Sequence, residues 1–409
     1  GLSDFAWRSE GLGVFCAPQP LLSTQSPKES KMRILLLTYE LPPVGGGGGR
    51  IAQDIAEKLA RRGHEIIIIT SHLQGLPKEE MLAGGIKVIR VPALRKEAFR
   101  AGFLTMGIYI LSGLWAGFRL TNKWMPDIIH VHFAVPTGVL AWALSRLKNI
   151  PYLLTAHLGD VPGGAPEKTG KWFKWVFPLT KPIWRDAAKV VAVSEFTRQL
   201  ALKHYPVPIE VIHNGVDLNA LNPGEISVQT PPRIIFAGRL MKQKNPLQIV
   251  RTLATLKDLA WECVLLGDGP LRVVVEDEIA RHRMQDRFVL SGWVTPEEVI
   301  ERFGKSDILF MPSLSEGLPV VGVQALAMGL TMLVSKIGGF VDLVDEGENG
   351  FLVQEAQQYE THLRSLLQSP EKIHACKRAS RQKAEAFSLE HIVQRYEEAL
   401  KEAALGQGG

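Results

Sequence analysis

The chain has 409 residues, more than one hydrophobic core usually supports, so we expect two or three domains. Hydrophobic residues make up 46% and charged residues 22%, as in ordinary soluble globular proteins. The net charge of +5 is small for this length and Lys and Arg are scattered, which argues against a nucleic-acid partner. Cys16, Cys263 and Cys376 lack metal-like or redox-like spacing, so we expect a reducing, cytoplasmic setting without a disulfide framework.

Residues 1–31 differ in composition from the rest of the chain. They are rich in Ser, Pro and Gly, and they lack the basic start and apolar core of a signal peptide. We therefore predict a disordered leader, with Met32 as a candidate for the native start.

From Arg33 onward, apolar segments alternate with amphipathic ones, which is the pattern of parallel sheets built from βαβ units. The strands predicted in the first half cover residues 34–38, 65–70, 87–91, 127–131, 152–156, 189–193 and 210–212. A turn-rich stretch without periodicity follows, from His213 to Pro232. The pattern then resumes with strands predicted at 233–237, 262–266, 287–290, 307–311 and 331–334. We predict two doubly wound, Rossmann-like domains, residues 32–215 and 216–387, joined near residue 215.

The last predicted helix has its own start signal, because Ser388 can cap it while Phe387 and Ile392 form a hydrophobic staple. Five apolar residues then share one face, namely Leu389, Ile392, Val393, Tyr396 and Leu400. We expect this face to pack back across the domain junction, so that residues 388–404 complete the first domain.

Residues 313–319, Ser-Leu-Ser-Glu-Gly-Leu-Pro, lie between a predicted buried strand and a helix predicted from Val320 to Met328. Ligands bind at this edge of open α/β sheets, since loops converge there and helix N-termini present free N–H groups. The carboxylate of Glu316 is suited to gripping hydroxyl groups at such an edge. Gln324 places a second polar side chain eight positions later.

Five consecutive glycines, Gly45–Gly49, follow the first predicted strand and Pro42-Pro43-Val44. Such a loop lets backbone N–H groups approach a phosphate at the positive end of a helix dipole. It lacks the Gly-Lys-Ser/Thr ending of a P-loop and the dinucleotide-binding fingerprint. A flexible connector is the alternative interpretation.

Two cations follow the first strand of the second domain, Arg239 directly after Ala237-Gly238 and Lys244 five residues later. At the carboxyl edge of the sheet they are suited to neutralising a diphosphate, with Arg binding oxygens bidentately and Lys acting as a point charge. The alternative is an ordinary solvated loop.

Several motifs occur in the order typical of one enzyme family. They are Pro-Pro-Val-Gly-Gly (42–46), His130-Val131-His132, Thr155-Ala156-His157, Val193-Ser194-Glu195, the run from Val211 to Asp217, Gly238-Arg239-Leu240 with Lys244, Leu266-Gly267-Asp268-Gly269-Pro270, and the Glu316 segment. From Met32 to about Ala404 the chain resembles the family 4 retaining nucleotide-sugar glycosyltransferases of the GT-B fold. That resemblance implies two Rossmann-like domains facing each other across a cleft, with the donor nucleotide held mainly by the C-terminal domain and the acceptor by the N-terminal one.

The resemblance also implies roles for individual residues. Arg239 and Lys244 would stabilise the departing diphosphate, Glu316 would meet sugar hydroxyls, and His157 would contact the transferred sugar. The remaining donor-binding positions that it implies are Gly46, Gly47, Gly238, Gly292, Trp293, Gly317, Leu318, Pro319 and Gln324. The family usually has Glu at the last of these positions, so Gln324 predicts weaker donor binding, by roughly 1 to 2 kcal/mol.

The resemblance implies a metal-independent reaction without a cofactor, in which a nucleotide-diphosphate sugar is the co-substrate and a lipid-linked, oligosaccharide or small-molecule species is the acceptor. Retention would follow from attack on the same face of the sugar. We expect a role in the biosynthesis of a cell-envelope polysaccharide. Two alternatives remain open, a GT-B-fold nucleotide-sugar epimerase and a binding protein with a degenerate donor site, for which Gln324 is the one direct hint.

Three histidines need their own interpretation. Asp160 three residues after His157 favours a functional role for that histidine over a structural one. We expect His130 and His132, on one strand, to point to opposite faces, so that one of them serves packing. Neither has the company of ligands that a zinc site needs.

Two stretches suggest a membrane. Residues 101–118 contain no charge and are flanked by Arg100 and Arg119, but they include four glycines, and we predict a helix buried in the first domain rather than a membrane span. Residues 171–177 mix cations with aromatics, which suits either a bilayer surface or a lid or core helix. We expect reversible peripheral attachment at the inner face of the plasma membrane.

Overall fold

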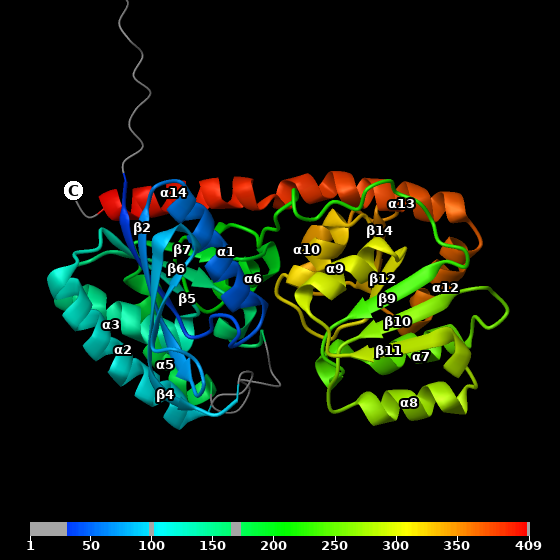
Figure 1. The fold of residues 1–409 in the computed structure, drawn as a ribbon, viewed down its shortest axis with the longest axis horizontal. Coiled ribbons are helices and arrows are strands. Elements are labelled where there is room, and N and C mark those ends of the chain that lie inside the picture. The colour runs from blue at the N-terminus through cyan, green and yellow to red at the C-terminus, as the bar shows by residue number, and fades with distance from the viewer. Residues whose placement is uncertain (1–30, 98–101, 165–172, 407–409) are drawn as a thin grey trace, which may run out of the picture. The chain divides into compact units, whose positions relative to one another are not determined.

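The computed structural model describes residues 31–97, 102–164 and 173–406. The predicted leader lies outside the described residues, apart from Lys31. The chain from Met32 onward forms one compact unit. Within it, two parallel sheets each carry their own helices, as expected for the GT-B fold (Figure 1).

In the described residues, the first sheet has eight strands in the order β3-β4-β2-β1-β5-β6-β7-β8. All neighbours are parallel except β3 and β4, which form an antiparallel pair. The strands are β1 (Arg33–Thr38), β2 (Glu65–Leu73), β3 (Glu79–Leu82), β4 (Ile86–Arg95), β5 (Ile128–His132), β6 (Tyr152–Ala156), β7 (Lys189–Ala192) and β8 (Glu210–Val211). Every strand predicted in this half is present, whereas β3 was missed because it is a short, largely solvent-exposed edge strand without an apolar run.

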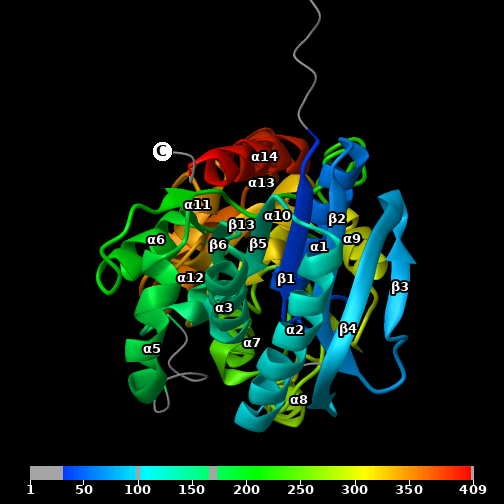
Figure 2. The same cartoon turned by 90° about the vertical axis from the view of Figure 1, so that its left-hand side faces the viewer.

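The helices of this half cover both faces of the first sheet. They are α1 (Gly47–Arg61), α2 (Phe103–Lys123), α3 (Val139–Lys148), α5 (Phe173–Arg185) and α6 (Glu195–Leu202), with short helical turns η1 (Ala83–Gly85), η2 (Ala134–Gly138) and η3 (Leu158–Asp160). Residues of α2, α3 and α5 share one apolar core with the sheet, and those helices lie side by side in Figure 2. Residues of α1 form a second core on the opposite face.

The second sheet has six described strands, all parallel, in the order β11-β10-β9-β12-β13-β14. They are β9 (Arg233–Ala237), β10 (Glu262–Leu266), β11 (Phe288–Gly292), β12 (Ile308–Met311), β13 (Thr331–Ser335) and β14 (Gly350–Val353). The five predicted strands are present, and β14 was missed because its apolar run is only four residues long. The helical segments of the half that contains the second sheet are η4 (Lys242–Lys244), α7 (Pro246–Ala254), α8 (Arg272–Arg281), η5 (Gln285–Arg287), α9 (Pro296–Gly304), α10 (Val320–Ala327), α11 (Phe340–Leu343), α12 (Ala356–Leu367), α13 (Pro370–Lys383) and η6 (Ala384–Phe387).

The last helix, α14 (Leu389–Leu405), follows α13 of the second sheet's half but belongs to the core beside the first sheet. All five apolar residues predicted for its inner face are buried. Ser388 stands at the N-cap position, but its side chain makes no capping hydrogen bond, so that part of the prediction was wrong. The helix is instead positioned by backbone hydrogen bonds, from Val216 N to Phe387 O at 3.0 Å and from Leu389 N to Val216 O at 2.8 Å.

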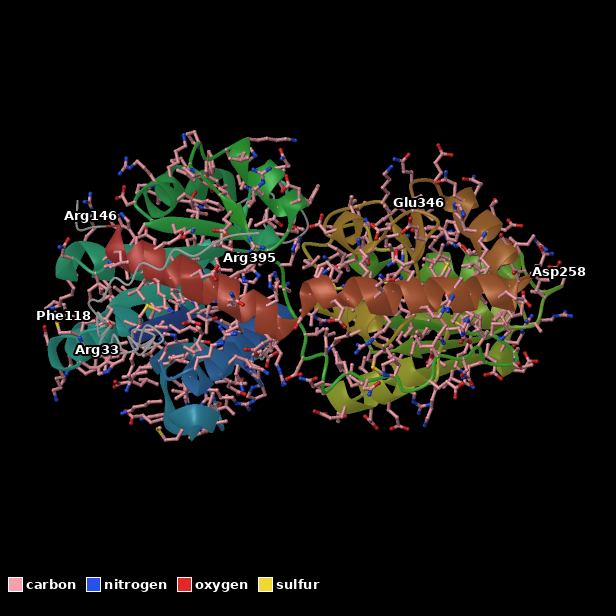
Figure 3. All side chains as sticks on the ribbon, turned by 90° about the horizontal axis from the view of Figure 1, so that it is seen from above. Arg33, Phe118, Arg146, Asp258, Glu346 and Arg395 are labelled. Carbon is pink, nitrogen blue, oxygen red and sulfur yellow. The ribbon has the colours of Figure 1, made fainter. Side chains whose placement is uncertain are left out.

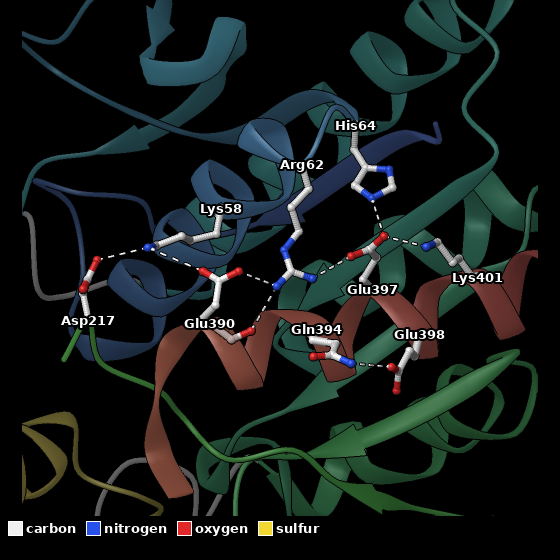
Figure 4. A network of polar contacts seen from close by, with 9 residues as sticks. All are labelled: Lys58, Arg62, His64, Asp217, Glu390, Gln394, Glu397, Glu398 and Lys401. Atoms are coloured by element: carbon white, nitrogen blue, oxygen red, sulfur yellow. Dashed lines mark hydrogen bonds and ion pairs between the residues drawn. The ribbon is translucent and has the colours of Figure 1, made fainter. Parts of the chain in front are cut away.

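A charged network fixes α14 against α1 (Figure 4). The buried carboxylate of Glu397 receives Arg62 at 2.8 Å, His64 at 3.2 Å and Lys401 at 2.5 Å. Burial alone would raise the pKa of Glu397, but the hydrogen bonds from Lys401 and Arg62, together with the contact to His64, outweigh it and lower that pKa to about 2. Glu397 is therefore ionised at any physiological pH and ties the C-terminal helix to the first sheet's half.

The predicted apolar helix at residues 101–118 exists as α2, but the expectation that it is buried was wrong. Only 17% of its apolar window is buried. One side packs on the protein through Tyr109, Gly113, Gly117 and Thr121, while large apolar side chains face outward. By length and composition alone α2 is long and apolar enough to cross a membrane, a property that core helices share.

Candidate active site

The carboxyl edges of the two sheets meet through close contacts between their loops. A Cβ atom at Gly317 would lie 3.1 Å from the Cβ of Leu158, the second residue after β6. A Cβ atom at Gly47 would lie 3.0 Å from Cγ2 of Val320, the first residue of α10. The Glu316 segment and the glycine-rich loop, which are 270 residues apart, thus converge at one edge.

The two predicted cations stand at the carboxyl end of β9. The ammonium group of Lys244 contacts Oε1 of Glu316 at 2.5 Å, and both side chains are largely buried. Nε of Arg239 is buried and has no hydrogen-bond partner in the described part of the chain. A buried guanidinium nitrogen without a partner is costly, so this one fits a position that an incoming anion would complete.

Glycines hold the loops of this edge within backbone contact of each other. Gly267 has a φ of +124°, and a Cβ there would lie 2.1 Å from the carbonyl oxygen of Gly238. Gly338 has a φ of +49°, and a Cβ there would lie 1.7 Å from the carbonyl oxygen of Glu316. No other residue type fits either position without moving the backbone, so the loops carrying Arg239 and Glu316 are closely braced.

Hydrogen bonds anchor the Glu316 segment on both sides. Asn214 Nδ2 donates to Leu318 O at 3.0 Å within the interior, and Gln243 Nε2 donates to Ser315 O at 2.9 Å. Oγ of Ser315 donates to Gly164 O, at 2.9 Å, which comes from the first sheet's half. Leu318 and Pro319 therefore lead into α10 along a path fixed by both halves of the molecule.

The glycine-rich loop is shorter than predicted, because Gly47 to Gly49 already form the first turn of α1. Gly46 is the N-cap residue, and its N–H donates to Oε2 of Glu40 at 3.0 Å. The space where a Cβ of Gly46 would lie is open, since no other atom is within 4 Å of that point. Sequence reasoning missed Glu40, although it is the second residue after β1, just as Arg239 is the second residue after β9. The arrangement is a helix N-terminus whose anion-binding groups are partly satisfied by a carboxylate.

The three histidines form one cluster, and the expectation that His130 and His132 face opposite ways was wrong. Residues two apart on a strand point to the same face, and these two rings lie 4.5 Å apart. Nδ1 of His132 lies 3.3 Å from Nε2 of His157. Burial lowers the pKa of His157 to about 4 and that of His130 to about 3, and it lowers that of His132 well below its usual value. The cluster is therefore neutral at pH 7.

Phe133 positions His157 and was not found by sequence reasoning. Its ring stacks on the imidazole at a centroid distance of 4.3 Å, and a Cβ at Gly48 would lie 2.7 Å from its Cζ atom. Its φ of +72° is unusual for a bulky residue, and nothing in the sequence signals it. Behind it, Asp160 accepts from His157 N at 2.8 Å, and burial raises the pKa of this carboxyl to about 7.

The remaining donor-binding positions lie on the second sheet's loops. Gln324 is half-buried and lies about one turn into α10, the helix that directly follows the Glu316 loop. Gly292 ends β11 with a φ of +68° and accepts a hydrogen bond from Gly267 N at 2.8 Å, which links it to the Arg239 loop. Trp293 beside it is 62% exposed. Among the described residues, no group of three or more His, Cys, Asp and Glu is placed to hold a metal ion.

Comparisons with known proteins agree with this arrangement. A sequence model of Glycosyltransferase Family 4 matches residues 45–220, and one of Glycosyl transferases group 1 matches residues 222–383. The glycogen synthase of Mycobacterium tuberculosis is 24% identical over 374 residues, which cover 86% of this chain and 90% of that protein.

Solved structures agree in fold. Sucrose-phosphate synthase from Thermosynechococcus elongatus matches with a TM-score of 0.80 at 19% identity, covering 91% of this chain and 98% of that one. The Anabaena protein HepE, solved in complex with UDP and glucose, matches with a TM-score of 0.71 at 18% identity, covering 90% and 99%.

The paired parallel sheets have the GT-B fold of these solved structures, and the two sequence models make the chain a glycosyltransferase. The two sequence models together take in most of residues 45–383. The chain belongs to the family 4 glycosyltransferases.

Proposed function

We propose that this glycosyltransferase moves a sugar from a nucleotide-diphosphate donor to a sugar or lipid-linked acceptor with retention of configuration and without a metal ion. The observation that carries the proposal is the pair of cations at the end of β9, where Arg239 has an unpartnered buried Nε and Lys244 contacts Glu316. The positive charge of these two side chains can stabilise the negative charge that develops on a departing diphosphate. The neighbour HepE was solved with UDP and glucose, which supports a nucleotide-sugar donor.

In the proposed reaction, the bond between the anomeric carbon and the diphosphate oxygen breaks while the acceptor hydroxyl oxygen bonds to the same face of that carbon. The acceptor proton passes to the leaving phosphate oxygen. Negative charge grows on the diphosphate as the bond breaks, and Arg239 and Lys244 stabilise it more in the transition state than in the ground state. No protein nucleophile is required.

Binding of the donor must also rearrange contacts that the side chains of the site make with each other. Lys244 and Glu316 neutralise each other at 2.5 Å, so a diphosphate that takes the ammonium group frees the carboxylate to accept hydrogen bonds from sugar hydroxyls. Likewise, Glu40 occupies Gly46 N–H at 3.0 Å, a group that would otherwise face a phosphate. Gly47, Gly238, Gly317 and the backbone at Gly292 and Trp293 complete the proposed donor site.

On the acceptor side, His157 is neutral at pH 7, since burial lowers its pKa to about 4. It is therefore suited to a hydrogen bond with a sugar hydroxyl rather than to proton transfer. We place the reaction in the cytoplasm, at the inner face of the plasma membrane, in synthesis of a cell-envelope polysaccharide. A Bacillus subtilis relative named as a putative teichuronic acid biosynthesis glycosyltransferase supports the cell-envelope role; it is 28% identical over 228 residues, which cover 53% of this chain and 55% of that protein.

The test is incubation with a panel of labelled nucleotide sugars, with and without acceptors, in the presence of EDTA. Nucleotide release that depends on the acceptor, and a product whose anomeric proton coupling matches that of the donor, are expected. Release of an epimer without acceptor would instead identify an epimerase, and binding without turnover a degenerate donor site. Loss of activity in EDTA that Mg²⁺ restores would contradict metal independence.

A further inference from the structure

Helix α2 turns its small residues inward. A Cβ at Gly113 would lie 2.8 Å from Cδ2 of Leu140, and one at Gly117 would lie 2.6 Å from Cδ1 of Leu144. These glycines let α2 approach α3 closely, while Tyr109 and Thr121 complete the buried side. Because the inward side consists mostly of small residues, the bulk of the helix's apolar surface is left outside.

The outward side of α2 carries the large apolar side chains. Leu104, Leu111, Trp115 and Phe118 are exposed by 74%, 70%, 64% and 40%. Their spacing of seven, four and three residues places them in one stripe along the helix. A surface helix of a water-soluble domain normally presents polar residues on that side, so the stripe marks a surface made for a partner.

Cations border this stripe. The guanidinium of Arg119 lies 4.6 Å from the ring centre of Trp115, and the ammonium of Lys148 lies 3.7 Å from that of Phe118. Helices α2, α3 and α5 include several Lys and Arg residues but no Asp or Glu. Phe118 and Arg146 lie in the same outer part of the first sheet's half (Figure 3). The acidic residues that follow α2 and α5 in the sequence are already paired, Asp127 with Arg33 and Asp186 with Arg146 and Arg185.

We propose that this stripe, Leu104, Leu111, Trp115 and Phe118 with Arg119 and Lys148 at its border, binds the surface of an anionic lipid bilayer. The helix lies in the plane of the membrane, with its leucines and aromatic rings between the headgroups and the acyl chains. Trp at such a depth and cations at headgroup level are the arrangement that a bilayer interface favours. Anionic headgroups supply the charge that the three helices lack.

Two other occupants fit the stripe less well. Spanning the membrane would require α2 to leave α3 and the sheet, against which its glycine side is closely packed. A second copy of the chain, related by a twofold axis, would place the stripe against itself. Arg119 and Lys148 would then face their own counterparts without an acidic residue from these helices between them.

The stripe is a different surface from residues 171–177, whose side chains lie mostly outside the described part. The stripe is formed by α2 and its neighbours alone, so its binding to lipid does not depend on the proposed transfer reaction. Binding of an acidic protein and self-association are the other outcomes that the test distinguishes.

The test is co-sedimentation of the full chain with vesicles of phosphatidylcholine alone or with about one third phosphatidylglycerol, at low salt. We expect binding to the anionic vesicles that falls about tenfold or more in Leu111→Ser/Trp115→Ser and weakens in Arg119→Gln/Lys148→Gln. The matched control is Val273→Ser/Val274→Ser on α8, where the valines are 65% and 47% exposed and binding should be unchanged. Circular dichroism checks that each variant is folded.

Fluorescence adds a second readout. The difference between wild type and Trp115→Phe should show a blue shift with anionic vesicles and quenching by brominated lipid. The proposal is overturned if the wild type binds neither vesicle, or if the stripe variant binds as well as the α8 control. It is also overturned if the wild type binds no vesicles but forms a dimer, or captures an acidic protein, and Leu111→Ser/Trp115→Ser loses that association.

Discussion

The two sheet edges that form the site differ in charge and in how they are held. The edge of the second sheet carries Arg239, Lys244 and Glu316 on loops braced by glycines in backbone contact. Around His157, the edge of the first sheet carries a stack of neutral rings, in which His132 is buried and Phe133 and His157 are half-buried. The difference suggests a division of labour, in which one edge binds the charged diphosphate and the other the uncharged hydroxyls of the sugars.

The largest expected effect is the loss of either cation at the charged edge. Arg239→Ala or Lys244→Ala should lower kcat/KM by about 100- to 1000-fold, because each removes a preorganised group from the developing charge of the leaving diphosphate. Steady-state kinetics with the cognate donor measures the change. Lys242→Ala, an exposed lysine in the same short helix, is the matched control and should stay within about twofold. Full turnover in both single variants would remove the basis of the comparison.

The glycine bracing of the charged edge gives the next effect. Gly338→Ala should lower the free energy of unfolding by about 2–4 kcal/mol and displace Glu316, since its Cβ would lie 1.7 Å from the Glu316 carbonyl. Chemical denaturation and donor titration measure the two changes. Gly347→Ala is the control, with a similar positive φ of +81° but nothing within 4 Å, and should cost only about 1 kcal/mol. Equal losses in both would show that close contact at this loop is unimportant.

In the half of the molecule that contains the first sheet, a charged cluster joins α14 to the end of α1. Glu397→Gln should lower the free energy of unfolding by about 2–3 kcal/mol, because Arg62, His64 and Lys401 would lose a buried carboxylate. Exposed Glu398 next to it is the control, and Glu398→Gln should change stability by less than about 0.5 kcal/mol.

The same cluster sets a pH dependence. The folded-state pKa of Glu397 is about 2, below that of an unfolded Glu, so its contribution is complete above the unfolded pKa and disappears as pH falls toward 2. The stability difference between wild type and Glu397→Gln should therefore shrink below about pH 4. A difference that stayed constant down to pH 2 would contradict the assigned ion pairs.

A smaller effect tests the neutral edge directly. His157→Phe should preserve stacking on Phe133 but lower kcat/KM by about tenfold, through loss of a hydrogen bond to the sugar. Since the pKa of His157 is about 4, the wild-type profile of kcat/KM should show no step from this residue between pH 6 and 9. A wild-type step near pH 6.5 that vanishes in the variant would show that the ring is charged during turnover.

The smallest effect sharpens the donor assignment. Gln324→Glu should tighten donor binding by up to about tenfold without changing acceptor choice, because a carboxylate offers a ribose two charged acceptor oxygens instead of one amide oxygen. Calorimetry with the donor measures it. Unchanged affinity would place this side chain away from the ribose.

Much of the fold follows from local pattern. Strands such as β1, β9 and β12 are continuous apolar runs because both faces of a parallel sheet are covered, and their carboxyl ends place Arg239 and Glu316 at one edge. The inner face of α14 is equally readable from its 3.6-residue period.

What could not be predicted depends on contacts between distant segments. The outward stripe of α2 arises because Gly113 and Gly117 pack against α3, so the apolar composition alone misled the burial prediction. The φ of Phe133 and the hydrogen bond from Gly46 N–H to Glu40 are set by the assembled loops. An edge strand such as β3 has no apolar signal because one of its sides remains in water.

The chain passes between the two sheets' halves twice, and the two passages lie against each other. Val216, where the chain enters the second half, is hydrogen-bonded to Phe387 and Leu389, where it returns to the first half, at 3.0 and 2.8 Å. Two parallel tethers at one point resist twisting far more than bending. Any relative motion of the two halves should therefore be a bending about this double connection, which would keep Arg239 and His157 in the same register.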